Sequence, residues 1–224
     1  MGFFDKLFKK RQSDQSSKID KLVSEPSIKM LDGNLFWTII DSSLKNSQSQ
    51  NEQESYLIKE IEKLSSTEMV GFFIRLNVLT HAIYTSTMWC AAHLMNGGYA
   101  SDDGFEYFRY WIISRGKKVY YNAKNSPDSL VIEYSSDKNE YAFETLSYVA
   151  IKSYQNSQKI DDDDEEQIFD YFYACEENCI DVDYSKFEDA LNHLSNFDID
   201  WNEDKPESMK ALCPNLYQMV ENKT

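Results

Sequence analysis

The chain has 224 residues, 42% hydrophobic and 14% aromatic, with a formal net charge of −15. This composition supports a globular domain with a sizeable core, and seven glycines and four prolines are too few for a turn-rich all-β architecture. A negative field of this size repels nucleic acid and anionic lipid, so we expect no nucleic-acid partner. It keeps the chain soluble and would attract a basic protein.

The sequence predicts a cytoplasmic protein. No apolar run reaches the roughly 20 residues that cross a bilayer, and the first residues lack the apolar core of a signal peptide. No pair of cysteines forms a C-x-x-C motif, so we expect reduced thiols at Cys90, Cys175, Cys179 and Cys213.

Residues 1–30 differ from the rest of the chain. They begin with a short amphipathic helix, followed by a polar linker, and carry a net charge of +3. Such a helix makes weak contact with a membrane surface or a partner groove, or folds back on the domain. Its apolar face consists of Phe3, Phe4, Leu7 and Phe8.

Apolar residues recur at regular helical spacing after residue 30. This spacing predicts helices over residues 35–47, from a capping box at Ser49 to Leu64, and from a second capping box at Ser65 through 69–84. The segment 69–84 is apolar nearly all round, which predicts a central, buried helix. The next helix, 85–95, ends at the stop signal Asn96-Gly97-Gly98.

A further helix begins at Ser101-Asp102-Asp103 and ends at Gly116. The pattern beyond it predicts helical segments over residues 117–123, 127–130, 139–154, 168–175, 184–194 and 206–220, the last broken near Pro214. We therefore predict an all-α fold, a single compact domain of about eight to ten helices over residues 31–222 with a flexible N-terminal tail.

Charge divides this domain into two parts. Residues 31–157, the core block, carry −4, whereas the part after residue 157 has nineteen acidic and five basic residues. The acidic part, 158–222, contains six consecutive acids at 161–166, which indicate a solvated loop or helix start.

Spaced aromatic residues, glycines and acids in the core block resemble the bacterial family known as domain of unknown function 4240. The matching words are Phe36-Trp37, Ile40-Asp41, Trp89, Ala91-Ala92, Gly97-Gly98, Ser101-Asp102-Asp103, Phe105, Tyr107-Phe108-Arg109, Trp111-Ile112-Ile113, Gly116, Pro127-Asp128-Ser129-Leu130 and Glu144 to Ala150. The resemblance covers about residues 31–157 well and implies a compact helical domain. It implies no activity, so no catalytic role is carried over.

The best site candidates lie in the helix that follows Gly97-Gly98. Asp102 and Arg109 are two helical turns apart and share a face, and Glu106 can pair with Arg109. One interpretation is a polar pocket with carboxylates for acid–base chemistry and an arginine to hold an anion. The other is structural, in which Asp102 or Asp103 caps the helix and Arg109 closes a buried salt bridge beneath Trp89 and Trp111.

Metal and cofactor signals are weak. His81 and His93 do not form a zinc motif, and a satisfied core or surface histidine is the simpler interpretation. Cys175 and Cys179 could join Cys213 and His193 at a metal only with loose spacing. We expect no metal and no cofactor.

Two functions remain open from the sequence. The first is a protein-interaction module, immunity- or antitoxin-like, that covers a basic partner by charge complementarity. Its candidate contact residues are Asp161, Asp162, Asp163, Asp164, Tyr171, Tyr173 and Trp201. The alternative is an enzyme or small-ligand sensor that uses Asp102, Asp103 and Arg109, with His93 nearby. Charge favours the interaction module over an enzyme, and no pattern assigns an oligomeric state.

Overall fold

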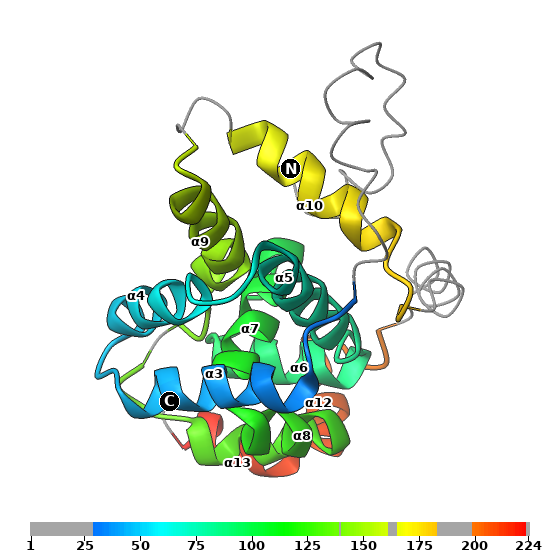
Figure 1. Ribbon diagram of the computed structural model, residues 1–224. Helices are drawn as coiled ribbons and strands as arrows, with labels where there is room; N and C mark the ends of the chain where they lie inside the picture. Colours follow the sequence, from blue (N-terminus) through cyan, green and yellow to red (C-terminus); the bar gives the residue numbers. More distant parts are fainter. Residues whose placement is uncertain (1–28, 139, 161–164, 183–198, 223–224) are drawn as a thin grey trace.

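The computed structural model describes residues 29–138, 140–160, 165–182 and 199–222. These ranges contain ten α-helices and two 3₁₀ helices, and their β-structure is limited to one isolated bridge between Asn202 and Lys205 (Figure 1). The predicted all-α fold is confirmed. The helices are α3 (Gly33–Lys45), α4 (Gln50–Ile61), α5 (Ser66–His81), α6 (Ser86–Met95), α7 (Asp102–Ser114), α8 (Lys117–Asn125), η1 (Pro127–Glu133), η2 (Glu144–Tyr148), α9 (Val149–Gln158), α10 (Glu165–Glu177), α12 (Pro206–Leu212) and α13 (Pro214–Glu221).

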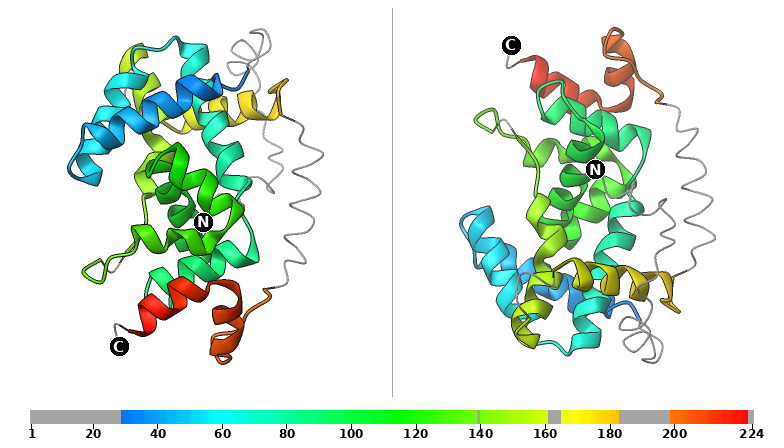
Figure 2. Two further views of the ribbon diagram at one scale, coloured as in Figure 1. Left: turned by 90° about the horizontal axis from the view of Figure 1, so that it is seen from below. Right: turned by 90° about the horizontal axis from the view of Figure 1, so that it is seen from above.

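Helix α5 is central, as its all-round apolar sequence predicts. It contacts α3, α7, α9 and α10, and ten of its residues are buried. Helices α6, α8 and α13 pack against η1 at the other end of the molecule, and α12 contacts α6 and α13 there. Figures 1 and 2 show α4, α9 and α10 grouped at one end and α12 and α13 at the opposite end.

The start of the described chain crosses α5 at Gly71. A Cβ added there would lie 2.6 Å from the Lys29 carbonyl oxygen, too close for any side chain. The Leu31 N–H donates to the Gly71 carbonyl at 2.9 Å, and the Arg75 guanidinium binds the Leu31 carbonyl. Only glycine permits this approach of two backbones.

Most of the predicted helices carry a side-chain cap at their N-terminus. Ser65 forms a full capping box with Glu68, and Thr85 caps α6 through the Met88 N–H. Ser49 caps α4, but the Glu52 carboxylate accepts the N–H of Gln48 and not that of Ser49, so this box is incomplete.

The predicted helix over residues 139–154 is wrong in its first part. Tyr141 and Phe143 are non-helical, and helical structure starts with η2 and continues as α9 to Gln158. The reason is tertiary hydrogen bonding: the Tyr141 N–H donates to the Asn96 side chain at 2.7 Å, and the Phe143 N–H donates to the Tyr107 carbonyl at 3.0 Å. Both rings enter the core.

Several predictions lie outside the described residues. They are the tail over residues 1–28 with Phe3, Phe4, Leu7 and Phe8, the acids at 161–164, and the helix over 184–194 with His193. None of the helices in the described ranges combines the length and apolar character that a membrane crossing requires.

Two aspartates cap helices that are distant in sequence. Asp41 of α3 accepts the Lys117 N–H at 2.9 Å and so caps α8. The Asp128 carboxylate accepts the Leu216 N–H at 2.8 Å and binds Asn215 through its N–H at 2.9 Å and its amide at 2.6 Å. Asp128 is buried, and it joins η1 to the N-terminus of α13.

Replacing Asp128 with alanine should lower the free energy of unfolding by about 2 kcal/mol or more, since α13 loses its cap and buried N–H groups lose their acceptor. Urea unfolding measures this change. The matched control is Asp204→Ala, an exposed aspartate near α12, which should shift the midpoint little. Equal shifts for the two variants would contradict the assigned role of Asp128.

Candidate functional site

Arg109 is the most buried of the site residues proposed from the sequence. Its side chain is only 1% exposed. The guanidinium carbon lies 4.6 Å from the centre of the Tyr84 ring and 4.8 Å from that of Phe105. Arg109 therefore reaches from α7 into a slot between two aromatic rings, where cation–π attraction stabilises the desolvated charge.

The guanidinium caps the C-terminus of α5. Its Nη1 donates to the Thr80 carbonyl at 3.1 Å, and its Nε donates to the Phe105 carbonyl at 3.3 Å. The last four residues of a helix leave carbonyls without helical partners and carry partial negative charge. A buried cation at this position is stabilised by both features.

The other carbonyls of that last turn are also satisfied. The Tyr120 hydroxyl donates to Leu79 at 2.8 Å. The carbonyls of Val78 and His81 accept the N–H groups of Ala82 and Tyr84, each at 3.0 Å. All four terminal carbonyls of α5 thus have a donor.

The predicted buried salt bridge of Arg109 is wrong. No ion pair joins its guanidinium to a carboxylate among the described residues. The buried Glu106 carboxylate instead accepts the Tyr110 hydroxyl at 3.2 Å. Burial raises the pKa of Glu106, and the positive charge of Arg109 opposes that rise, so the two residues interact through space.

The predicted capping role of Asp102 or Asp103 is also corrected. Ser101 is the cap of α7 and accepts the Gly104 N–H at 3.1 Å. Both aspartates are exposed in the first turn, where they favour the positive end of the helix dipole. Because Arg109 is buried and the aspartates are exposed, the structure does not bring these residues together as one polar site.

Trp89 fixes the turn before α7. Its ring stacks on Phe105 with centres 4.7 Å apart, and its Nε1 donates to the Ala100 carbonyl at 3.0 Å. Within that turn Gly97 and Gly98 have φ values of 70° and 87°, which side chains rarely adopt.

His93 and Trp201, assigned to different candidate surfaces from the sequence, are in contact. His93 is buried, and its ring centre lies 4.9 Å from that of Trp201. Burial lowers the pKa of His93, while the charge of Glu203 opposes this shift. The Trp201 Nε1 donates to the Ser86 carbonyl at 3.1 Å, so Trp201 attaches the segment before α12 to α6.

The aromatic residues of α10 face the core. Tyr171 is only 8% exposed, Tyr173 is half-buried, and the Tyr173 ring lies 5.4 Å from that of Phe73 in α5. They therefore anchor α10. Asp161, Asp162, Asp163 and Asp164, the acids expected beside them, lie outside the described residues.

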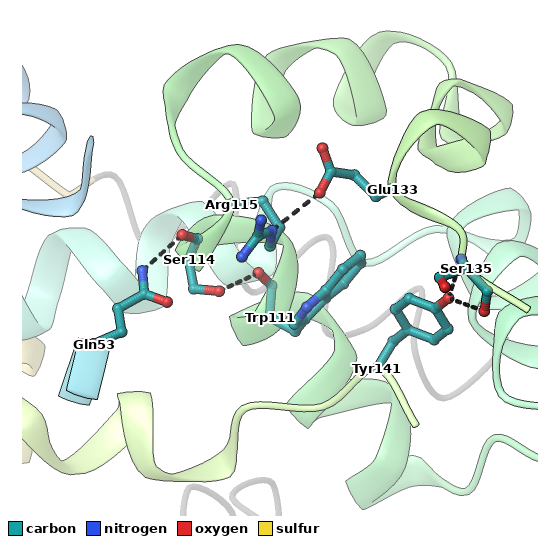
Figure 3. A network of polar contacts seen from close by, with 7 residues as sticks. All are labelled: Gln53, Trp111, Ser114, Arg115, Glu133, Ser135 and Tyr141. Atoms are coloured by element: carbon teal, nitrogen blue, oxygen red, sulfur yellow. Dashed lines mark hydrogen bonds and ion pairs between the residues drawn. The ribbon is translucent and has the colours of Figure 1, made fainter. Parts of the chain in front are cut away.

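Trp111 belongs to a polar network that the sequence did not predict (Figure 3). The buried Trp111 ring meets that of Tyr141 at 74°, with centres 4.9 Å apart. Arg115, at the end of the same helix, forms an ion pair with Glu133 at 3.0 Å. Gln53 of α4 donates to the Ser114 carbonyl at 2.9 Å. Each donor lies 18 or 61 residues from its acceptor, so helical periodicity could not predict these pairs.

A buried acidic cluster lies where α10 docks on α5. Glu176 is 8% exposed and accepts the Asn77 amide at 3.0 Å. Burial, with a smaller contribution from the charge of Glu177, raises the pKa of Glu176 to about 7. Burial raises the pKa of Tyr173, and the charges of Glu176 and Glu106 raise it further. No sequence signal marked this cluster, because Glu176 occurs among exposed acids.

The cysteines do not assemble the loose metal site considered from the sequence. Cys213 lies beside Cys90. A hydrogen bond with Cys90 and burial both raise the pKa of the Cys213 thiol. Cys175 and Cys179 form a separate pair of neighbours at the end of α10. In the part of the chain that the structure describes, no three His, Cys, Asp or Glu side chains are grouped to hold a metal ion.

Comparison with known proteins identifies the core block. Residues 31–156 match the family described as "Protein of unknown function (DUF4240)". The chain belongs to this family. No curated protein and no solved structure matches it. The match ends within α9, so α10, α12 and α13 lie beyond the DUF4240 block and are attached to it by Tyr173, Trp201 and Asp128.

Arg109→Ala should cost about 3 kcal/mol or more of the free energy of unfolding, because it opens a cavity between two rings and removes the donor to Thr80. Arg115→Ala is the matched control: its half-buried ion pair with Glu133 should be worth no more than about 1 kcal/mol. Chemical unfolding at one pH measures both. Similar losses would show that burial between the rings is not what stabilises α7 against α5.

Glu176 makes stability depend on pH with a defined sign. Its folded pKa of about 7 lies above the ordinary glutamate value of 4.5, so the folded state holds an extra proton between these two pH values. Its contribution to the free energy of unfolding is fully present below pH 4.5 and is lost as the pH rises through about 7. Glu176→Gln removes this titration and should be more stable than the native chain at pH 8.

Unfolding in urea at several pH values between 5 and 8 tests this expectation. The gap between Glu176→Gln and the native chain should widen as the pH rises, by up to about 1 kcal/mol per pH unit. Glu207→Gln, an exposed acid in the first turn of α12, is the control and should leave the pH dependence unchanged. A gap that stays constant with pH would contradict the assignment.

Proposed function

We propose that this DUF4240 protein is an interaction module that binds a basic protein through its acidic C-terminal part. The observation that carries the proposal is the separation of charge: −14 after residue 157 against −4 over residues 31–157. Residues 165–182 contain six acids and no basic residue. Complementary charge steers a partner and selects it against others.

The arrangement of α10 supports this proposal. Tyr171, Phe172 and Tyr173 turn toward the core, with the Phe172 and Phe73 ring centres 5.3 Å apart. The acids Glu166, Glu177 and Asp181 are exposed. An apolar face anchors the segment while charged groups remain available to solvent, which suits an electrostatic contact surface.

An immunity- or antitoxin-like role is the specific form that we favour. In such a pair an acidic inhibitor covers the basic active site of a toxin, where charge complementarity is strong. This form predicts that the basic partner is toxic when produced alone and harmless when produced together with this chain.

The alternative, an enzyme or small-ligand sensor at Asp102, Asp103 and Arg109, has less support. An anion-binding arginine needs free donors, whereas the Arg109 guanidinium is enclosed by two rings and bound to two carbonyls. The two aspartates face solvent without it. We therefore do not propose chemistry at these residues.

Affinity capture from the cell of origin tests the interaction. At low ionic strength the native chain should recover a distinct basic protein, and raising salt to about 0.3 M should weaken recovery because screening shortens the reach of surface charges. Neutralising Glu166, Glu177 and Asp181 together should reduce the association rate of the purified pair by about tenfold or more.

The matched control neutralises three exposed acids of the core block, Asp102, Asp103 and Asp137. It changes the net charge equally and should retain the partner. If both triple variants bind alike, the acidic C-terminal part is not the contact surface. If the native chain recovers no basic protein, the proposed function fails.

A further inference from the structure

Trp111 and Tyr141 form an aromatic corner that already holds a cation. Their rings meet at 74°, and the Lys138 ammonium lies 4.7 Å from the centre of Tyr141 and 5.1 Å from that of Trp111. Both distances are within the roughly 6 Å over which a cation is attracted to a ring face. The chain thus supplies its own ammonium group to two rings at once.

The walls of the corner are fixed by contacts that do not involve the Lys138 side chain. The Tyr141 hydroxyl accepts the Ser135 N–H at 2.7 Å and donates to the Ser135 carbonyl at 3.1 Å (Figure 3). The Tyr141 N–H is bound by Asn96, and Trp111 stacks on Phe108 within the core. Contacts other than those of the Lys138 side chain therefore hold both rings in place.

Lys138 itself is less firmly held. Its backbone N–H closes a turn to the Ser135 carbonyl at 3.1 Å, but its ammonium forms no ion pair with a carboxylate of the described residues. Glu133, one of the two acids whose charge acts on Lys138, is engaged by Arg115. The side chain is half-buried, so it gives up part of its hydration for two ring faces.

The surroundings of Lys138 favour a cation that loses little hydration free energy on leaving water. Burial and the positive charge of Arg115 lower the pKa of Lys138, while Glu133 and Glu140 oppose that shift. An ammonium group is strongly hydrated, whereas guanidinium and methylated ammonium groups lose less on leaving water and bind aromatic faces well. Because Tyr141 is fully buried and Trp111 is 3% exposed, such a group reaches the two rings only when the Lys138 side chain moves aside.

We propose that Trp111 and Tyr141 form a binding site for an organic cation of the methylated-ammonium or guanidinium class, with Lys138 as an internal competitor. The site belongs to the DUF4240 block and is independent of the acidic C-terminal part. Figure 2 shows the segment that carries Lys138, between η1 and η2, well separated from α10 in both views.

Titration with tetramethylammonium chloride tests the site, with ionic strength held constant by sodium chloride. The shift of the Trp111 indole N–H in NMR spectra reports binding in the full chain. Lys138→Ala should bind about tenfold more tightly than the native chain, which is the gain expected when the lysine leaves the corner free about one tenth of the time. Circular dichroism confirms that the variant is folded.

Lys124→Ala is the matched control, because it removes the same charge from α8. It should bind as the native chain does. If all three proteins bind alike, or if both variants gain equally, the cation responds only to overall charge and the proposal is overturned. Absence of an indole shift in folded Lys138→Ala overturns it as well.

Two further probes identify the source of the cation. Capped tripeptides with a central trimethyllysine or arginine are titrated into Lys138→Ala beside tetramethylammonium. Peptide binding at Trp111 indicates a side chain of another protein, whereas binding of tetramethylammonium alone indicates a small free cation. Failure of all three probes to move the indole resonance contradicts the site.

Discussion

The packing of this domain depends on one buried cation at the end of its central helix. Arg109 projects from α7 between Tyr84 and Phe105 and donates to the last turn of α5. Burying a guanidinium without a contacting carboxylate is costly. The cost is offset by two ring faces, two carbonyl acceptors, the negative end of the α5 dipole and the nearby charge of Glu106. Since Tyr84 lies between α5 and α6, the Arg109 side chain links α7 to the end of α5 and to the segment that leads into α6.

Burial of His81 and the charge of Arg109 both lower the pKa of this histidine, to about 3, so the imidazole stays neutral beside the guanidinium.

The sequence predicts the features of this fold that depend on neighbouring residues. The caps at Ser65 and Thr85, the buried character of α5 and the break of the last helix at Pro214 all follow from local spacing. The same reasoning fails where the partner is remote. Asp128 caps a helix that begins 86 residues later, and hydrogen bonds from Asn96 and Tyr107 replace the helical bonds expected at Tyr141 and Phe143. Helical periodicity places Arg109 on a face but cannot tell whether its partner is a carboxylate or the carbonyls of another helix.

The role of the candidate site residues is also decided by partners that are distant in sequence. Trp89, Asp102, Asp103 and Arg109 were grouped by sequence spacing, and in the structure they separate into a buried set that fixes a turn and two exposed acids that favour a helix start. The residues shared with the DUF4240 family therefore hold the block together. Its glycines allow tight turns and close approach, its aspartates cap helices distant in sequence, and its aromatic rings surround Arg109. We therefore look for specific function away from Arg109, in the acidic part attached to this scaffold or at the corner of Trp111 and Tyr141.

The central claim is that Arg109 is a closed structural contact and not a group that waits for an anion. NMR observation of its guanidinium protons tests this most directly. A side chain bonded to Thr80 and Phe105 between two rings should give a resolved Arg109 Nε–H resonance that exchanges slowly with water and stays unchanged when phosphate or carboxylate ions are added. A resonance that exchanges rapidly, or that shifts on titration with these anions, would contradict the account and return Arg109 to the candidates for a ligand site.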